Sequence, residues 1–262
     1  MAKGSCLRQR LGGEVKLERK QIMNTIKFNH PNKPLMVAHR GVSGLETENT
    51  CAAFVAAGNR SYYGIETDVH KTADGKYVVF HDDTTGRLAE VNVTIEETDY
   101  DTLRKMQLRQ KDGNFGRSDL RIANLQEYIG ICKNYEKTAV LELKNHFEKA
   151  DVIEIGRIIE DMGYLDRVTF ISFDFENLVY VKEIYPNQPV QYLTGSCDRQ
   201  LAQRLAAYGM DLDIYFEGVN PGMMADCKEL GINVNCWTVD QLEDAQRLVE
   251  MGVRYITSNI LE

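Results

Sequence analysis

Short apolar segments typical of buried strands recur eight times along this chain, and a helix-like segment lies between each neighbouring pair. The expected strands are Leu35–His39, Gly64–Val69, Thr138–Lys144, Val168–Phe173, Val190–Thr194, Leu212–Glu217, Asn233–Thr238 and Val253–Thr257. The expected helices are Thr50–Gly58, Leu125–Asn134, Glu148–Met162, Phe175–Ile184, Cys197–Tyr208, Pro221–Leu230 and Gln241–Met251. Regular alternation of this kind predicts a parallel sheet, because each helix carries the chain back to the start of the next strand.

The number of strand–helix units separates the two common parallel folds. Eight units over about 230 residues predict a closed (β/α)8 TIM barrel. A doubly wound open sheet is the competing fold, but no glycine-rich phosphate loop follows Leu35–His39. Glycines also stand directly after four of the expected helices, where a C-terminal cap belongs: Gly163, Gly209, Gly231 and Gly252.

A polar stretch interrupts the alternation after the second expected strand. The apolar run Tyr77–Phe80 follows Gly64–Val69 through a turn that contains Asp74 and Gly75, so we expect it to be an additional strand outside the eight. Residues 83–124 are rich in charged side chains and fit a cover over the barrel mouth. The expectation is a TIM barrel with a small insertion after the second strand.

Charge divides the chain into two unequal parts. The first 33 residues carry a net charge of +6, which leaves −14 on the remainder of a chain whose total is −8. An acidic body argues against nucleic acid as a partner. The basic leader lacks the apolar stretch of a secretory signal. We expect residues 1–33 to form a flexible basic extension and 34–262 to form one barrel domain.

Cysteine and hydropathy patterns bear on the compartment. The six cysteines form no Cys-X-X-Cys pair and no metal-type spacing, so a reducing cytoplasm is the expected location. No run approaches the about 18 apolar residues of a transmembrane helix, and stable membrane insertion is not expected. Nothing in the sequence indicates an oligomeric state.

Ionisable side chains gather at the ends of the first three expected strands. They are His39, Arg40, Glu66, Asp68, Glu142 and Lys144, and His81 directly follows the additional strand. Side chains alternate along a strand, so Glu66 and Asp68 share one face. Taken alone, these two carboxylates fit the solvated face of an exposed strand equally well. Active sites of TIM barrels lie at the C-terminal ends of the strands, so the whole set is expected to meet in one polar cavity.

The types of side chain in this set indicate a chemistry. Three carboxylates without cysteine are hard oxygen donors, which suit one divalent cation, Mg²⁺ or Ca²⁺, rather than zinc. Two histidines with Arg40 and Lys144 beside such an ion predict a site for an anionic, phosphorylated substrate.

From about Met36 to Asn259 the chain resembles the glycerophosphodiester phosphodiesterase family, whose fold is a TIM barrel. The resemblance rests on motifs in the family's order and spacing: HRG at 39–41, ENT at 48–50, ETDV at 66–69, DG at 74–75, HDDT at 81–84, LELKN at 141–145, SF at 172–173 and WTV at 237–239. A lone HRG is weakly informative, whereas the full set is highly specific.

The resemblance implies a role for each matching position and a small glycerophosphodiester as the substrate. Metal ligands are implied at Glu66, Asp68 and Glu142, and general acid/base catalysis at His39 and His81. Arg40 and Lys144 match residues that hold the phosphate, and Phe173 and Trp237 match aromatic residues that line the pocket. Glu48 and Asn49 match a supporting shell near the first histidine, His39. The implied reaction is metal-dependent hydrolysis to glycerol 3-phosphate and an alcohol.

Three departures from the family pattern stand out. Thr47 precedes ENT where proline is frequent, residues 122–125 differ from the usual Ile-Pro-Thr-Leu, and Asn259 stands near the end where many members carry aspartate. We expect none of them to touch a catalytic group. Two further histidines, His70 and His146, are expected to be solvated or capping residues.

Alternative functions remain open from the sequence. A lysophospholipase D-like diesterase would act on lipids, and it needs an apolar entrance that the charged residues 83–124 offer poorly. A metal-independent phosphoinositide-cleaving barrel would leave the three carboxylates without a purpose. A catalytically inactive phosphate- or sugar-binding barrel would be expected to lack at least one of the catalytic groups.

Overall fold

The computed structural model describes residues 24–262 and confirms the (β/α)8 barrel. Eight parallel strands follow one another in the order β1-β10-β9-β8-β7-β6-β5-β2, and pairing of β1 with β2 closes the ring. The barrel strands are β1 (Leu35–Ala38), β2 (Gly64–Lys71), β5 (Thr138–Leu143), β6 (Val168–Ser172), β7 (Val190–Thr194), β8 (Asp211–Tyr215), β9 (Val234–Trp237) and β10 (Tyr255–Ser258).

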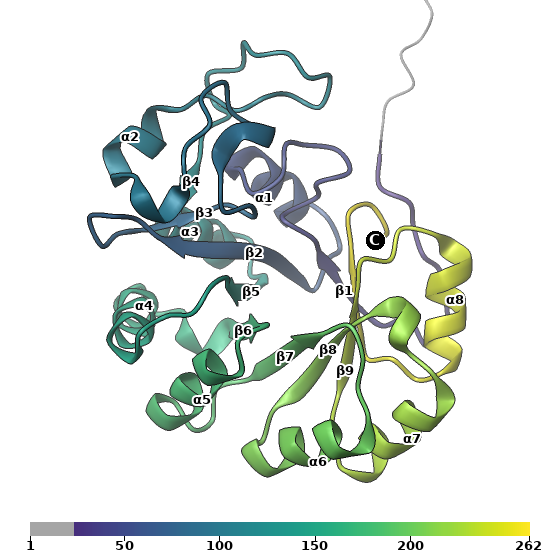
Figure 1. The fold of residues 1–262 in the computed structure, drawn as a ribbon. Helices are drawn as coiled ribbons and strands as arrows, with labels where there is room; N and C mark the ends of the chain where they lie inside the picture. The colour runs from purple at the N-terminus through teal and green to yellow at the C-terminus, as the bar shows by residue number, and fades with distance from the viewer. Residues whose placement is uncertain (1–23) are drawn as a thin grey trace, which may run out of the picture.

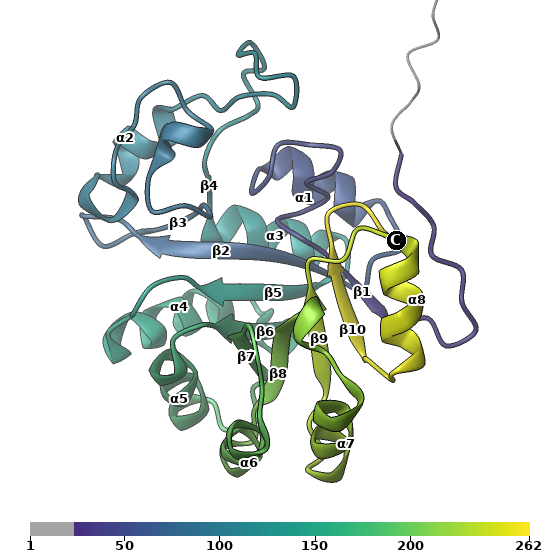
Figure 2. The same ribbon diagram turned by 45° about the vertical axis from the view of Figure 1, so that its right-hand side comes forward.

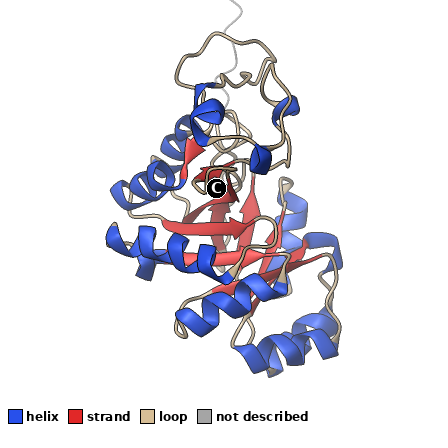
Figure 3. Ribbon diagram, turned by 60° about the vertical axis from the view of Figure 1, so that its left-hand side comes forward, coloured by secondary structure: helices blue, strands red, loops and turns tan. Residues whose placement is uncertain are grey.

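Helices surround the strands on the outside of the barrel, as Figures 1 and 3 show. They are α1 (Cys51–Gly58), α2 (Tyr100–Lys105), α3 (Leu125–Asn134), α4 (Lys149–Asp161), α5 (Phe175–Ile184), α6 (Arg199–Tyr208), α7 (Pro221–Glu229) and α8 (Leu242–Glu250). All but α2 coincide with a predicted helix. Each of these seven buries one face in the shell between helices and strands, which forms the largest apolar core.

The predicted additional strand is present as β3 (Tyr77–Val79), and it pairs antiparallel with the end of β2. This pairing explains why β2 extends two residues beyond its predicted end, to Lys71. Gly75 has a φ of +75°, so the Asp-Gly turn is of the left-handed kind that glycine favours. A short strand β4 (Ala123–Asn124) then pairs with β3 and leads the chain into α3.

Residues 83–124 form a compact insertion beside β3 and α1, seen at the upper left of Figure 2. It contains α2 and two single turns of 3-10 helix, η1 (Thr85–Arg87) and η2 (Ile95–Glu97). Leu103 and Leu108 are fully buried in a second apolar core that the insertion shares with β3. The insertion is therefore a packed unit despite its many charges.

The first described residues pack against the end of the chain. Ile26 forms a parallel β-bridge with Leu261. The carboxylate of Glu262 accepts hydrogen bonds from Thr25 and Ser61, and it forms an ion pair with Lys27. Most of the predicted flexible extension, residues 1–23, lies outside the described part of the chain. Within residues 24–262 no helix combines the length and the apolar character needed to cross a membrane.

Candidate active site

The predicted site residues lie around the C-terminal ends of neighbouring strands β1, β2 and β5. Glu66 and Asp68 on β2 and Glu142 on β5 each offer a carboxylate oxygen, and these three oxygens lie within 4.8 Å of one another. All three side chains are buried, with 3%, 1% and 6% of their surface exposed. Strand register explains their convergence, because Asp68 lies directly opposite Glu142 in the β2–β5 pair.

Electrostatics within the cluster favours a bound cation. Burial and the adjacent Asp68 charge raise the pKa of Glu142 to about 8, and the same two causes raise that of Glu66 well above its usual value. The pKa of Asp68 is lowered, because Lys144 and Arg40 outweigh the effect of its burial. If all three carboxylates were ionised, the cluster would carry more negative charge than its surroundings stabilise. Three hard oxygen donors in this state fit a divalent cation such as Mg²⁺ or Ca²⁺.

Two basic residues border the carboxylates. The Nζ atom of Lys144 lies 3.1 Å from Glu142 Oε1 and 3.3 Å from Asp68 Oδ1. Arg40 follows β1, which flanks β2 on the side away from β5, and its Nε lies 3.8 Å from Asp68 Oδ2. Among residues 24–262 this Nε has no hydrogen-bond partner. A buried guanidinium N–H that lacks a partner is available to an anionic ligand.

A sharp turn after β1 brings the Arg40 backbone to the cluster. Arg40 and Gly41 have φ values of +52° and +76°, and the Arg40 N–H donates to Glu66 Oε2 at 2.7 Å. A Cβ atom at Gly41 would lie 2.7 Å from the Ala53 backbone, so only glycine fits there. The HRG motif therefore owes its glycine to the close approach of α1.

His39 is oriented by a residue that sequence reasoning set aside. Its Nδ1 lies 2.7 Å from Asn259 Oδ1, and Asn259 Nδ2 in turn donates to Asp240 Oδ2 at 2.6 Å. Because Asp240 fixes the amide orientation, the Asn259 oxygen faces the ring, and His39 donates its Nδ1–H. The expectation that the departure at Asn259 touches no predicted catalytic group was wrong. Its position directly after the last strand was the signal that could have found it.

His81 is oriented by a carboxylate. Its Nδ1 lies 2.7 Å from Asp82 Oδ1. Burial would raise the pKa of Asp82, but hydrogen bonds from Arg87 and His81 lower it to about 2. Asp82 is therefore ionised and accepts the Nδ1–H of His81. In both histidines the Nδ1–H is engaged, so the Nε2 atom is left as the acceptor when the ring is neutral.

The pKa values of both imidazoles are lowered. Burial, followed by the Arg40 charge, lowers that of His39 to about 4. Burial also lowers that of His81, while the Asp68 charge opposes the shift. Both rings are consequently neutral near pH 7, and their Nε2 atoms carry no proton.

The two predicted supporting residues, which were expected near His39, contact Arg40 and Asp68. Glu48 accepts a hydrogen bond from Arg40 Nη1 at 2.8 Å. Asn49 is buried with a φ of +53°, and its Nδ2 donates to Asp68 Oδ2 at 2.8 Å. The hydroxyl of Thr67 donates to the Asn49 oxygen at 2.7 Å, which fixes the orientation of the amide.

Aromatic side chains lie at the ends of three strands on the other side of the barrel. Phe173 directly follows β6 and is 46% exposed, and its ring meets that of Trp237, at the end of β9, edge to face at 5.7 Å. Tyr215 at the end of β8 lies 5.7 Å from the same indole. Tyr215 was missed from the sequence, where only its place at a strand end could have indicated it.

The two remaining histidines differ from each other. His146 is about half exposed and lies 2.9 Å from Asp174, the N-cap of α5, as a solvated residue would. His70 is fully buried, and its Nδ1 lies 3.0 Å from Glu96 of the insertion. The prediction that His70 is solvated or capping was wrong, because the β2–β3 pair and the insertion cover it.

Comparisons with known proteins identify the family of this chain. The model of the glycerophosphoryl diester phosphodiesterase family matches residues 39–261. The glycerophosphodiester phosphodiesterase of Caldanaerobacter subterraneus is 30% identical over 226 residues, which are 84% of this chain and 92% of that protein.

Solved structures give the same result. An Oleispira antarctica phosphodiesterase in complex with the product sn-glycerol-3-phosphate superposes with a TM-score of 0.80 at 26% identity, covering 87% of this chain and 93% of that one. A glycerophosphodiester phosphodiesterase of Parabacteroides distasonis superposes with a TM-score of 0.71 at 27% identity, covering 90% and 94%. This chain therefore belongs to the glycerophosphoryl diester phosphodiesterase family.

Proposed function

We propose that this chain hydrolyses small glycerophosphodiesters to glycerol 3-phosphate and an alcohol, using one divalent cation and two histidines. The observation that carries the proposal is the buried carboxylate cluster flanked by Arg40 and Lys144. Membership of the family supports the reaction class. We assign the cation to Glu66, Asp68 and Glu142.

The basic residues account for binding of the phosphate. A phosphodiester becomes more negative as it reacts, and the bound cation would offset charge on its non-bridging oxygens. Arg40 and Lys144 stand on either side of the carboxylates, where their N–H groups can donate to the same oxygens. Their positions are fixed before substrate arrives, so little reorganisation is needed during the reaction.

The two histidines account for proton transfer. One neutral ring accepts the proton of the nucleophile at Nε2, and the other, once protonated, donates to the departing alkoxide. The nucleophile is either water or the adjacent glycerol hydroxyl of the substrate, which would give a cyclic phosphate first. Because the two rings act in opposite protonation states, activity is expected to follow a bell-shaped pH profile.

Release of glycerol 3-phosphate from glycerophosphocholine and glycerophosphoethanolamine tests the proposal. Activity should disappear with EDTA and return with Mg²⁺ or Ca²⁺. His39→Ala and His81→Ala should each lower kcat by about 10²–10⁴, with metal binding retained because neither is assigned as a ligand. Binding without turnover in the wild-type chain would instead identify an inactive phosphate-binding barrel.

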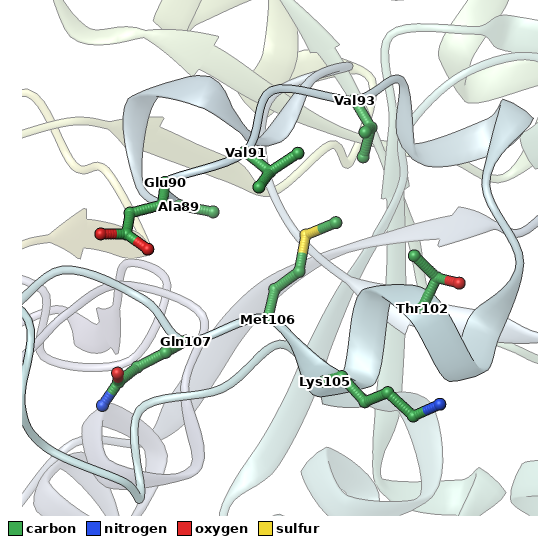
Figure 4. A pocket seen from close by; sticks show the side chains of 8 residues that line it. All are labelled: Ala89, Glu90, Val91, Val93, Thr102, Lys105, Met106 and Gln107. Atoms are coloured by element: carbon green, nitrogen blue, oxygen red, sulfur yellow. The ribbon is translucent and has the colours of Figure 1, made fainter.

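A lipid-directed diesterase is the second candidate, and one hollow in the insertion favours it. The hollow, about 490 Å³ in volume, is lined by Val91, Val93 and Met106 with Glu90 and Lys105 at its sides (Figure 4). None of the residues that line it belongs to the candidate active site. Leu103 and Leu108, two of the few large apolar side chains of the insertion, are buried in its core.

We propose the soluble substrate because the residues that line this hollow lie apart from the candidate active site. The comparison that decides is kcat/KM for glycerophosphocholine against lysophosphatidylcholine. A preference for the lysolipid, lost in Met106→Glu, would reverse the choice.

We also propose that residues 34–262 carry the activity and that the protein works in the cytoplasm on a small molecule. The five cysteines within residues 24–262 are free thiols, as expected in a reducing compartment. Deletion of residues 1–22 keeps the contacts of Thr25 and Lys27 with Glu262 and should leave activity unchanged.

A further inference from the structure

Arg87, at the end of η1 in the insertion, contacts two carboxylates at once. Its Nη1 and Nη2 atoms donate to the two oxygens of Glu48, both at 2.8 Å. Its Nε and Nη2 atoms donate to the two oxygens of Asp82 at 2.6 and 3.0 Å. All three nitrogens of the guanidinium are thus engaged by two acidic side chains 34 positions apart in the sequence, Glu48 and Asp82.

Each of those carboxylates holds a residue of the candidate active site. Glu48 Oε1 accepts from Arg40, which we assign to phosphate binding. Asp82 Oδ1 faces Nδ1 of His81, which we assign to proton transfer. Arg87 therefore lies at the centre of a continuous chain of charged contacts that joins the phosphate-binding group to one acid/base group.

The local fold fixes where Arg87 stands. Thr85 is fully buried, and its hydroxyl donates to the Val91 carbonyl at 2.6 Å, which closes the loop that carries η1. At Gly86 a Cβ atom would lie 2.7 Å from the Asn92 side chain, so the loop packs tightly around this turn. The backbone that presents Arg87 is consequently held by the insertion rather than by the barrel.

We propose that Arg87 is a positioning residue for the reaction, and that the insertion uses it to hold both Arg40 and His81. The inference rests on the function proposed above. Arg87 touches neither substrate nor the reacting atoms, and it acts through Glu48 and Asp82. Without it, Glu48 keeps its contact with Arg40, and Asp82 keeps its contact with His81.

Arg87 acts through two arms, the Glu48–Arg40 contact and the Asp82–His81 contact, and these arms should affect different kinetic constants. Glu48→Gln loosens Arg40, which binds the phosphate in the ground state and afterwards, so KM should rise. Asp82→Asn loosens His81, which acts only during proton transfer, so kcat should fall. Arg87→Ala disturbs both arms, and kcat/KM should fall by about 10- to 100-fold, the usual effect of a misplacement of about 1 Å.

Double variants test whether Arg87 works through its two partners. Arg87→Ala combined with Asp82→Asn should have a kcat within about threefold of the more damaged single variant, because both changes break the same arm. The same result is expected for KM when Arg87→Ala is combined with Glu48→Gln. If the losses of the two single variants multiply in full in the double variant, the two residues act independently and the proposal is overturned.

Arg199→Ala is the matched control. Arg199 also joins two carboxylates, those of Asp226 and Glu229, and it is 47% exposed where Arg87 is 45% exposed. It connects α6 and α7 away from the candidate site. Because exposed ion pairs add little stability, both variants should shift Tm by only a few degrees, and only Arg87→Ala should lose activity. Equal loss of activity in both, or a large fall in Tm for Arg87→Ala alone, would indicate a structural role.

The geometry of the Arg87 guanidinium distinguishes Arg87 from a lysine at the same position. Arg87→Lys keeps the charge, but one ammonium group cannot donate in parallel to both carboxylates. It should therefore remain clearly impaired, and full activity in Arg87→Lys would show that charge alone suffices.

A readout without turnover separates this inference from the proposed function. The nitrogen NMR signals of the His81 ring should show a single neutral tautomer, protonated at Nδ1, in the wild-type chain. Arg87→Ala should show a mixture of the two tautomers at the same pH, and Arg199→Ala should match the wild type. A wild-type chain that hydrolyses no diester would refute the proposed function, while the His81 signals would still decide the role of Arg87. An unchanged His81 tautomer in Arg87→Ala would refute that role.

Discussion

Binding of a divalent cation to the cluster of Glu66, Asp68 and Glu142 is expected to release protons. Burial, with the adjacent Asp68 charge, raises the pKa of Glu142 to about 8 in the metal-free protein, and the pKa of Glu66 is also raised. Carboxylates must be deprotonated to bind a metal. Below pH 8 the cation therefore has to displace at least one proton.

The size of the effect follows from the pKa of Glu142. A pH of 6 is about two units below the pKa of Glu142. Deprotonation of this carboxyl group therefore costs about 2.7 kcal/mol, which lowers metal affinity about 100-fold. A pKa that is raised in the metal-free state means that affinity increases with pH. The increase should be about tenfold per pH unit for each displaced proton, and the Glu142 contribution should level off above about pH 8.

Calorimetric titration with Mg²⁺ or Ca²⁺ in two buffers of different ionisation enthalpy measures the number of protons released. We expect one to two at pH 6, and one fewer for Glu142→Gln, which also binds the ion more weakly. Asp244→Asn, on the outer helix α8, is the charge-matched control and should behave as the wild type. Affinity that stays constant from pH 5.5 to 8, with no proton released, would refute the reasoning about this cluster.

Three other perturbations have defined outcomes. His39→Ala and His81→Ala, each combined with a metal titration, should lose turnover by about 10²–10⁴ and keep metal affinity within about threefold, and a joint loss of both would contradict their assignment. Asn259→Leu removes the acceptor of the His39 Nδ1–H and should lower kcat about 10- to 100-fold, whereas an unchanged kcat would show that Asn259 does not orient the ring. Asp213 is buried inside the barrel, one of its oxygens has no partner within residues 24–262, and burial raises its pKa well above the usual value. The protonated Asp213 carboxyl group therefore stabilises the folded protein fully below about pH 4, and this stabilisation is lost as the pH rises. Asp213→Asn should accordingly flatten the decline of Tm between pH 5 and 9.

The fold was predictable because its signal is repeated. Each strand is a short apolar run, and each helix between strands ends near a glycine or begins at a capping residue, so errors at single boundaries did not alter the number of units. The carboxylate cluster was predictable for a related reason. A period of two along β2 places Glu66 and Asp68 on one face, and the neighbouring strand β5 supplies Glu142 at the matching register.

The contacts that orient the site were not predictable from local sequence. Asn259 reaches His39 across 220 positions, and Arg87 reaches Glu48 across 39. Neither separation follows from the period of a helix or a strand, so the local sequence does not indicate that these residues are in contact. His70 was misjudged for the same reason, because the insertion residue Glu96 that covers it is distant in sequence and the insertion follows no strand–helix pattern.

Phosphorus NMR of glycerophosphocholine turnover in water enriched in heavy oxygen tests the central claim most directly. We predict a signal of glycerol 3-phosphate that carries the heavy isotope on phosphorus, present with Mg²⁺ or Ca²⁺ and absent with EDTA. That result requires cleavage of the bond between phosphorus and the choline oxygen. Release of phosphocholine, or equal turnover in EDTA, would contradict the account.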